Sequence, residues 1–239
     1  MSLEVRIVSL GALPTHPLWV DNSGAIDPTG PRAGHSTCSL VRSGKRVIIV
    51  DPGLPDAIIT ARLSERAGLR PSEVTHVFLT SFKADVRRGL LAFEHAPWWI
   101  NLAEREGMGI PLVHSAQEAL RAGDDDLADT LQRDIALLKR CEAAPDRVAD
   151  RVDLFPLPGV TPGCCGLLIS GPASGPGPGT TLITGDAVPT IEHFERGLVL
   201  DSSTDINQAR ESFKEAIEIA DVIIPGRGGM IVNQTRRLL

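Results

Sequence analysis

The chain has 239 residues and a formal net charge of −6, which is enough length for one sizeable core, so we expect a single domain over residues 1–239. Apolar residues make up 42% of the chain, an ordinary share for a soluble globular protein. Tyrosine is absent, so aliphatic side chains have to form most of the core. The acidic balance and the lack of a long basic run argue against nucleic acid as a partner.

The sequence predicts a protein of the reducing cytoplasm without a membrane anchor. Met1 to Leu10 lacks the basic and long apolar regions of a signal peptide, and no apolar run is long enough to span a bilayer. The cysteines at positions 38, 141, 164 and 165 form neither a plausible disulfide framework nor a zinc-finger spacing.

The first elements in chain order are strands and one long loop. Val5 to Leu10 is apolar and β-branched, which predicts a strand. Ala12 to Gly34 is rich in Pro, Gly, Asp and Asn and predicts a long surface loop, of the kind that is often functional. Ser39 to Arg42 and Arg46 to Asp51 then predict a hairpin.

The next elements alternate helices with short strands. Pro55 to Gly68 carries apolar residues at helical spacing and ends in a glycine, so it predicts an amphipathic helix. Val74 to Leu79 predicts a buried strand, and a helix is expected to begin near Asp85. "PWWI", ending at Ile100, predicts a further short strand.

A helical region with a break follows. "PLVHS", residues 111–115, is strand-like, and from Ala116 apolar residues recur at helical spacing. Gly123 followed by three aspartates, Asp124 to Asp126, indicates the end of one helix and the start of another.

The second half returns to strands. Three strands are expected at "RVDLFPL", "CGLLIS" and "TTLITGD", with Gly171 to Gly179 as a flexible hairpin tip between the last two. Asp205 to Ile219 predicts a helix, and "DVIIPGRGG" a closing strand and loop. This order favours a two-layered β core with helices on its outer faces over a doubly wound parallel sheet.

Several of these strands end in tight polar turns, where active sites are often found. They are "VFLTSFKADVRRG", "PLPGVTPGCCG", "LITGDAV" and "VIIPGRGG", and the early hairpin ends in Asp-Pro-Gly. In order, spacing and flanking residues, these motifs resemble those of the metallo-β-lactamase superfamily, from "STCSLVRSGKRVIIVDPG" to "IIPGRGG". The resemblance implies an α/β fold of the α+β type, a four-layer αββα sandwich.

The resemblance also identifies the positions of the family's metal ligands. The family pattern is T-H-x-H-x-D-H at a strand end, then T-P-G-H, G-D and a last G-H, and these groups hold two zinc ions that generate a hydroxide nucleophile. In chain order, the corresponding positions here hold Ser81, Lys83, Asp85, Val86, Cys164, Asp186 and Arg227. Both carboxylates are kept, and none of the six histidines stands at a ligand position.

These replacements predict the loss of the dinuclear zinc site, so we expect no metal cofactor. Lysine and arginine have no lone pair for a metal at neutral pH, and valine has no ligand atom. Without metals, Asp85 and Asp186 would repel each other unless a counter-charge or a proton neutralises them. We expect Lys83 and Arg227 to supply that charge, with Arg227 as the better candidate for a bidentate contact. The predicted cleft residues are Ser81, Lys83, Asp85, Cys164, Asp186 and Arg227.

Other interpretations of these residues stay open at this point. A relocated site for zinc or another divalent metal would use His35, Cys164, Asp85 and Asp186. Cys164 could act as a nucleophile beside a histidine, although most isolated cysteines are small buried hydrophobes. The polar residues could also have structural roles alone, with Asp85 as the cap of a following helix.

Three functions fit these observations. The preferred one is a metal-free relative of the hydrolases whose cleft binds a small anionic ligand, through Lys83, Arg227 and Arg87, or which serves a protein partner. The second is a hydrolase of an ester, thioester or phosphoester with an altered metal site. The third is a structural or interaction protein whose cleft is closed.

Overall fold

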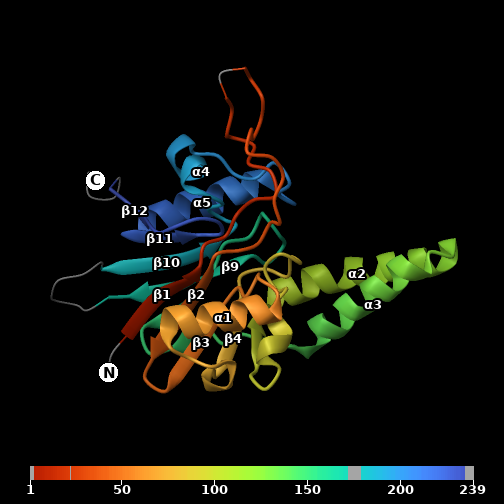
Figure 1. The fold of residues 1–239 in the computed structure, drawn as a ribbon, viewed down its shortest axis with the longest axis horizontal. Helices are drawn as coiled ribbons and strands as arrows, with labels where there is room; N and C mark the ends of the chain where they lie inside the picture. The colour runs from red at the N-terminus through yellow and green to blue at the C-terminus, as the bar shows by residue number, and fades with distance from the viewer. Residues whose placement is uncertain (1–2, 22, 172–178, 235–239) are drawn as a thin grey trace.

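Two sheets packed face to face form the middle of the molecule (Figure 1). The computed structural model describes residues 3–21, 23–171 and 179–234, and within these residues each of the two sheets has six strands. Gly171 and Gly179 flank the expected hairpin tip, but residues 172–178 lie outside the described residues.

The first sheet follows the order of the sequence. Its strands are β1 (Leu3–Ser9), β2 (Cys38–Ser43), β3 (Arg46–Val50), β4 (His76–Leu79), β5 (Trp98–Ile100) and β6 (Cys141–Ala143). β1, β2 and β3 are antiparallel, whereas β3 to β6 are parallel to one another. The carboxyl ends of β3 and β4 therefore lie at the same edge of this sheet.

The second sheet contains the remaining strands. They are β7 (Arg147–Ala149), β8 (Val152–Pro156), β9 (Cys165–Ser170), β10 (Thr180–Gly185), β11 (Val222–Pro225) and β12 (Ile231–Val232). β10 and β11 are parallel and the other neighbours are antiparallel. Consequently the carboxyl ends of β10 and β11 also meet at one edge.

Helices cover the outer faces of the two sheets. They are α1 (Asp56–Ala67), α2 (Leu102–Ala122), α3 (Asp125–Arg140), α4 (Ile191–Arg196) and α5 (Ile206–Ile219), with the 3₁₀ helices η1 (Pro71–Glu73) and η2 (Leu90–Phe93). α1 lies outside the first sheet and α5 outside the second, while α2 and α3 project together beyond the sheets (Figure 1). Within the described residues, no helix is both long enough and apolar enough to cross a membrane.

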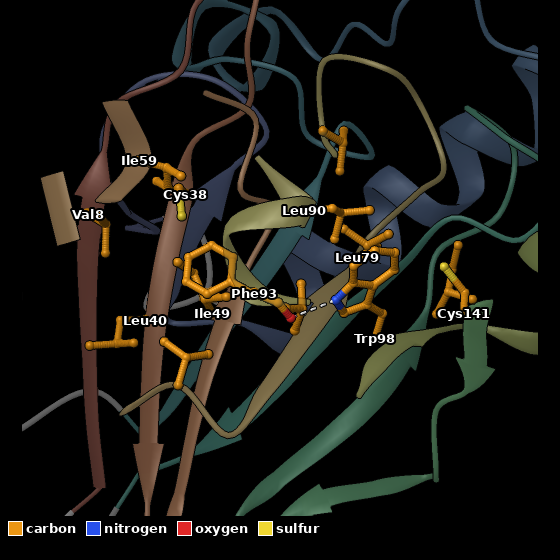
Figure 2. Packing of buried hydrophobic residues seen from close by; sticks show 14 of the residues in the cluster. Val8, Cys38, Leu40, Ile49, Ile59, Leu79, Leu90, Phe93, Trp98 and Cys141 are labelled. Carbon is orange, nitrogen blue, oxygen red and sulfur yellow. Dashed lines mark hydrogen bonds between the residues drawn. The ribbon is translucent and has the colours of Figure 1, made fainter. Parts of the chain in front are cut away.

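Apolar clusters fill the spaces between these layers. One lies between the first sheet and its helices and contains Ile59, Phe93 and Trp98, and in it Trp98 Nε1 donates to the Phe93 carbonyl at 3.0 Å (Figure 2). A second lies between the two sheets and includes Phe78 and Ile183. A third lies beneath α5. The predicted four-layer αββα sandwich is confirmed.

Two local predictions are wrong. "PLVHS" lies inside α2 rather than in a strand, with Pro111 within the helix and Ile110 77% exposed. A short apolar run does not distinguish strand from helix by itself, and here the helix is the longer element. No helix begins at Asp85, because residues 84–86 form a turn and η2 starts only at Leu90. The role of Asp85 as a helix cap is therefore excluded.

A buried glutamate at the start of α2 joins two loops. Glu104 is fully buried, and its carboxylate accepts hydrogen bonds from the backbone N–H of Phe82 at 2.8 Å and of Gly163 at 2.9 Å. A side chain at position 163 would place its Cβ 2.0 Å from the Glu104 nitrogen, which explains the glycine. The loop after β4 is thereby tied to the loop before β9.

Glu104→Ala should lower the free energy of unfolding by about 2–6 kcal/mol. The substitution leaves two buried N–H groups without an acceptor, and each costs about 1–3 kcal/mol. Urea denaturation measures this change. Glu106→Ala, at a more accessible position of the same helix, is the matched control and should leave the midpoint unchanged. Equal midpoints for both variants would exclude the buried link.

Candidate functional site

The loops that follow β4, β10 and β11 meet at one edge of the sandwich. The loop after β4 carries Lys83 and Asp85, the turn after β10 carries Asp186, and the loop after β11 carries Arg227. Backbone hydrogen bonds join the two sheets here, since Cys165 N donates to the Thr80 carbonyl at 2.9 Å. Residues far apart in the sequence are thus brought together.

Four of these side chains form a charged cluster, which consists of Lys83, Asp85, Asp186 and Arg227. Lys83 Nζ lies 2.8 Å from Asp186 Oδ2. Arg227 Nη2 lies 2.6 Å from Asp85 Oδ2 and 3.3 Å from Asp186 Oδ2. The two cations therefore contact the two carboxylates, as the charge argument from the sequence required.

Arg227 makes this contact differently from the expected bidentate geometry. A single nitrogen, Nη2, bridges the two carboxylates, while Nη1 donates to the carbonyl of Gly226 at 3.1 Å. Gly226 is needed for close packing, because a Cβ there would lie 2.3 Å from Asp186 Oδ1. One guanidinium nitrogen thus bridges the two carboxylates, and the other binds the backbone of the loop that carries Arg227.

Asp186 and Lys83 stabilise each other's ionised forms. Burial by itself would raise the pKa of Asp186, but the charges of Arg227 and Lys83 outweigh it and hold this pKa below its usual value. Burial would likewise lower the pKa of Lys83, and Asp186 reverses the direction, so this pKa is raised. Two positive and two negative charges cancel within the cluster.

A third carboxyl group lies close to the cluster, and the sequence analysis missed it. Asp51 is buried at the end of β3, where its oxygens accept from Thr80 N at 2.8 Å and Thr80 Oγ1 at 2.7 Å. Burial raises the pKa of Asp51 to about 7, despite these two donors. Asp51 is the first residue of the Asp-Pro-Gly motif, but from the sequence we interpreted this motif only as a marker of the fold.

The two predicted cleft residues outside the charged cluster, Cys164 and Ser81, are both buried. Cys164 belongs to the apolar cluster beneath α5, and burial raises the pKa of its thiol well above the usual value. A neutral, enclosed thiol suits neither a nucleophile nor a metal ligand. Ser81 is also buried, and its hydroxyl finds no hydrogen-bond partner in the described part of the chain, nor do Asp186 Oδ1 and Arg227 Nε.

Zinc does not fit this set of residues. His35 is turned toward the N-terminal loop, where its ring nitrogens lie 3.1 Å from the Ala33 carbonyl and 3.0 Å from that of Leu10. Among residues 3–21, 23–171 and 179–234, no three His, Cys, Asp or Glu side chains are arranged to hold a metal ion. Ammonium and guanidinium groups, which offer no lone pair, contact the two carboxylates instead.

Arg87 also points away from the cluster. Its guanidinium lies 4.2 Å from the centre of the Phe82 ring and pairs with Asp134 of α3 at 2.7 Å. The charge that the sequence analysis assigned to a ligand is thus paired with a carboxylate of α3.

An open cleft of about 490 Å³ lies over the charged cluster. Lys83, Asp85 and Arg227 line its floor, and His193, Thr15, Asp201 and Ser202 add further polar groups. Its apolar walls come from two segments of the chain, and they contain Leu13, Leu18, Ile26, Leu198, Val199 and Leu200. The cleft is hollow rather than filled by side chains.

The N-terminal loop forms one wall of this cleft and is anchored to α4. His16 is buried, stacks on Trp19 with ring centres 4.4 Å apart, and places Nε2 3.2 Å from Glu192 Oε2. Trp19 Nε1 donates to Glu192 Oε1 at 2.8 Å. Within the loop, Asp27 accepts from His16 N at 2.6 Å. The sequence indicated a functional loop but not these anchoring residues.

Comparison with known families agrees with this architecture. The sequence profile of the metallo-beta-lactamase superfamily matches residues 31–227. The chain belongs to the metallo-β-lactamase superfamily. Among curated protein sequences, none matches it.

Solved structures share this fold at low sequence identity. A hydrolase named AbOPH is 16% identical, with 94% of this chain and 86% of that chain covered and a TM-score of 0.64. AidC, a dizinc quorum-quenching lactonase, is 18% identical, with coverages of 82% and 74% and a TM-score of 0.63. AiiA of B. thuringiensis, solved with N-decanoyl-L-homoserine at its active site, is 20% identical, with coverages of 94% and 92% and a TM-score of 0.61.

Arg227→Met should lower the free energy of unfolding at pH 7 by about 3–5 kcal/mol, because it leaves a buried carboxylate short of its counter-charge. The pKa of Asp186 is depressed in the folded protein, so its contribution to stability is present above pH 3.8 and is lost as pH falls through the folded value. The deficit of the variant should therefore be largest near neutral pH and shrink in acid.

Urea denaturation at pH 7 and pH 3.5 measures the deficit. Arg147→Met, which removes an exposed ion pair with Asp153, is the control and should change neither value measurably. An Arg227→Met variant as stable as the parent at both pH values would mean that no buried ion pair exists there.

Asp51→Asn should remove a pH dependence of stability. The pKa of Asp51 is about 7 in the folded chain, against an ordinary value of 3.8, so the folded chain binds the proton more tightly than the unfolded one. Its contribution is present below pH 3.8 and is lost as pH rises to about 7, a change of up to about 4 kcal/mol. The backbone φ of 52° at this position is tolerated by asparagine.

The test compares the free energy of unfolding of parent and Asp51→Asn at several pH values from 4 to 8. The difference between the two proteins should change in favour of the variant as pH rises. A difference that is independent of pH would show that Asp51 does not titrate in this window.

Proposed function

We propose that this chain is a metal-free member of its superfamily, in which the charged cluster replaces the metal centre and the cleft above it binds a small ligand through an anionic group of that ligand. The observation that carries the proposal is the contact of Lys83 and Arg227 with both retained carboxylates, at 2.6–3.3 Å. Cations at these positions perform the electrostatic task of the lost metals, since they keep two neighbouring carboxylates ionised.

The same geometry argues against hydrolysis by this site. A metal-bound hydroxide needs ligand atoms with lone pairs, and the cluster offers only two carboxylates that are already paired. A covalent mechanism needs an activated nucleophile, whereas the thiol of Cys164 is enclosed and protonated at neutral pH. The altered-metal hydrolase is supported only by the hydrolases and lactonases that share the fold.

A ligand in the cleft can contact the ammonium group of Lys83. The side chain of Lys83 is 30% exposed, and one of its three N–H groups is directed to Asp186. The carboxylate or phosphate of a ligand would accept from the others. Because the cleft is open, the structural role with a closed cleft receives less support.

A protein partner is the second candidate. The α2–α3 hairpin carries exposed apolar side chains, with Ile110 77% and Val113 42% exposed, beside a hollow lined by Ile135 and Leu138. Such a surface suits contact with another protein.

Four free cysteines support the reducing cytoplasm as the location that we propose.

Metal analysis of the purified protein tests this proposal. Protein from cells supplied with zinc, iron and manganese should contain far less than one metal ion per chain, and a chelator should leave its melting temperature unchanged. The matched control is a variant with histidine at all five changed ligand positions, which are Ser81, Lys83, Val86, Cys164 and Arg227.

The control should gain zinc, provided that its near-ultraviolet circular dichroism matches the parent. Stoichiometric metal in the parent, together with a melting temperature that falls on chelation, would contradict the metal-free centre.

A further inference from the structure

The cleft exposes only two members of the charged cluster. The side chains of Lys83 and Asp85 are 30% and 22% exposed, whereas those of Arg227 and Asp186 are 2% and 1% exposed. A ligand would therefore meet one ammonium group and one carboxylate. Both come from the single turn of residues 83–86, in which Val86 N donates to the Lys83 carbonyl at 3.1 Å.

Each of these two groups has unused hydrogen-bonding capacity. Lys83 Nζ donates to Asp186 Oδ2 and to no other acceptor among the described residues, so two of its three N–H groups are free. Asp85 Oδ2 accepts from Arg227, and no described residue donates to Oδ1. The floor of the cleft thus offers spare donors and a spare acceptor from the same turn.

The charges at the floor of the cleft favour a ligand whose own positive and negative charges cancel. The four charges of the cluster cancel, so a ligand with a net charge would leave that charge uncompensated at a partly buried site. Asp201, an exposed residue at the cleft, adds a further carboxylate, which makes a simple anion less suitable, while water screens its charge from the floor. Burial lowers the pKa of His193, so its ring adds no positive charge at neutral pH.

The walls favour an apolar body behind that head group. Leu13, Leu18 and Ile26 face the cleft from the N-terminal loop, and Leu198, Val199 and Leu200 line it from the segment after α4. Each methylene group of a ligand that is buried against such walls tightens binding about fourfold. A volume of about 490 Å³ accepts a chain of several carbons.

We propose that the cleft recognises zwitterionic ligands with an apolar body, the chemistry of an α-amino acid with a long aliphatic side chain. The ligand carboxylate accepts hydrogen bonds from Lys83, the ligand ammonium group donates to Asp85, and the aliphatic chain lies against the leucine-rich walls. The proposal rests on the proposed function, because it names the ligand class of the same cleft.

Three probes with a common carbon chain test this proposal. They are 2-aminooctanoate, octanoate, which lacks the ammonium group, and heptylamine, which lacks the carboxylate. Binding to the full chain at pH 7 is measured by the chemical shifts of backbone amides, including those of the N-terminal loop that forms one wall, and by the fluorescence of the three tryptophans, of which Trp19 lies in that loop. The zwitterion should bind at least tenfold more tightly than either truncated probe.

Charge-removing variants assign the two contacts. Asp85→Asn should abolish the preference for 2-aminooctanoate over octanoate, and Lys83→Gln should abolish its preference over heptylamine. Lys45→Gln, on the exposed β2–β3 turn, is the control and should change neither ratio. The comparison of the three probes in the unaltered chain decides the question even where a variant fails to fold.

The outcomes separate this inference from the proposed function. Octanoate that binds as tightly as 2-aminooctanoate would overturn the zwitterion and leave an anion-binding cleft. Heptylamine that binds as tightly as the zwitterion would overturn both, and so would failure of all three probes to bind. Stoichiometric metal in the parent would refute the proposed function whatever the probes do.

Discussion

Arg227 Nη2 lies between Asp85 and Asp186, 2.6 Å from one carboxylate and 3.3 Å from the other, and this bridge joins loops from both sheets. Asp85 follows β4 of the first sheet, while Asp186 and Arg227 follow β10 and β11 of the second. Two acids brought to one edge of a sandwich repel each other unless a cation lies between them. The guanidinium, with Lys83 beside Asp186, meets this requirement without a metal.

The bridge also underlies the ligand class that we propose. Because the charges within the cluster cancel, we expect a zwitterion to bind at its floor more tightly than a single ion does. Asp51 shows the effect of distance from the counter-charges, since burial raises its pKa to about 7 even though Arg227 acts to lower it. The same edge of the sandwich therefore contains one depressed carboxyl pKa, that of Asp186, which contacts two cations, and one elevated carboxyl pKa, that of Asp51, which burial raises.

Sequence patterns predicted a two-layered β core with outer helices. The resemblance to the superfamily predicted the full sandwich and the proximity of Lys83, Asp85, Asp186 and Arg227, which lie on turns at strand ends. Neither predicted the directions of side chains outside this cluster. Arg87 turns to Asp134 on α3, and the N-terminal loop is held by contacts with α4 that no periodicity encodes. These outcomes depend on tertiary packing, and residues three or more elements apart decide them.

The central claim, that cations hold the retained carboxylates in place of metal ions, is tested most directly by the ¹³C chemical shift of the Asp186 carboxyl group. Titration with acid, with and without added zinc, reports both its pKa and its ligation. The claim predicts a pKa below 3.8 and no change of the shift or the titration when zinc is added. A carboxyl group that titrates above 3.8 without metal, and whose shift moves on addition of one equivalent of zinc, would contradict it.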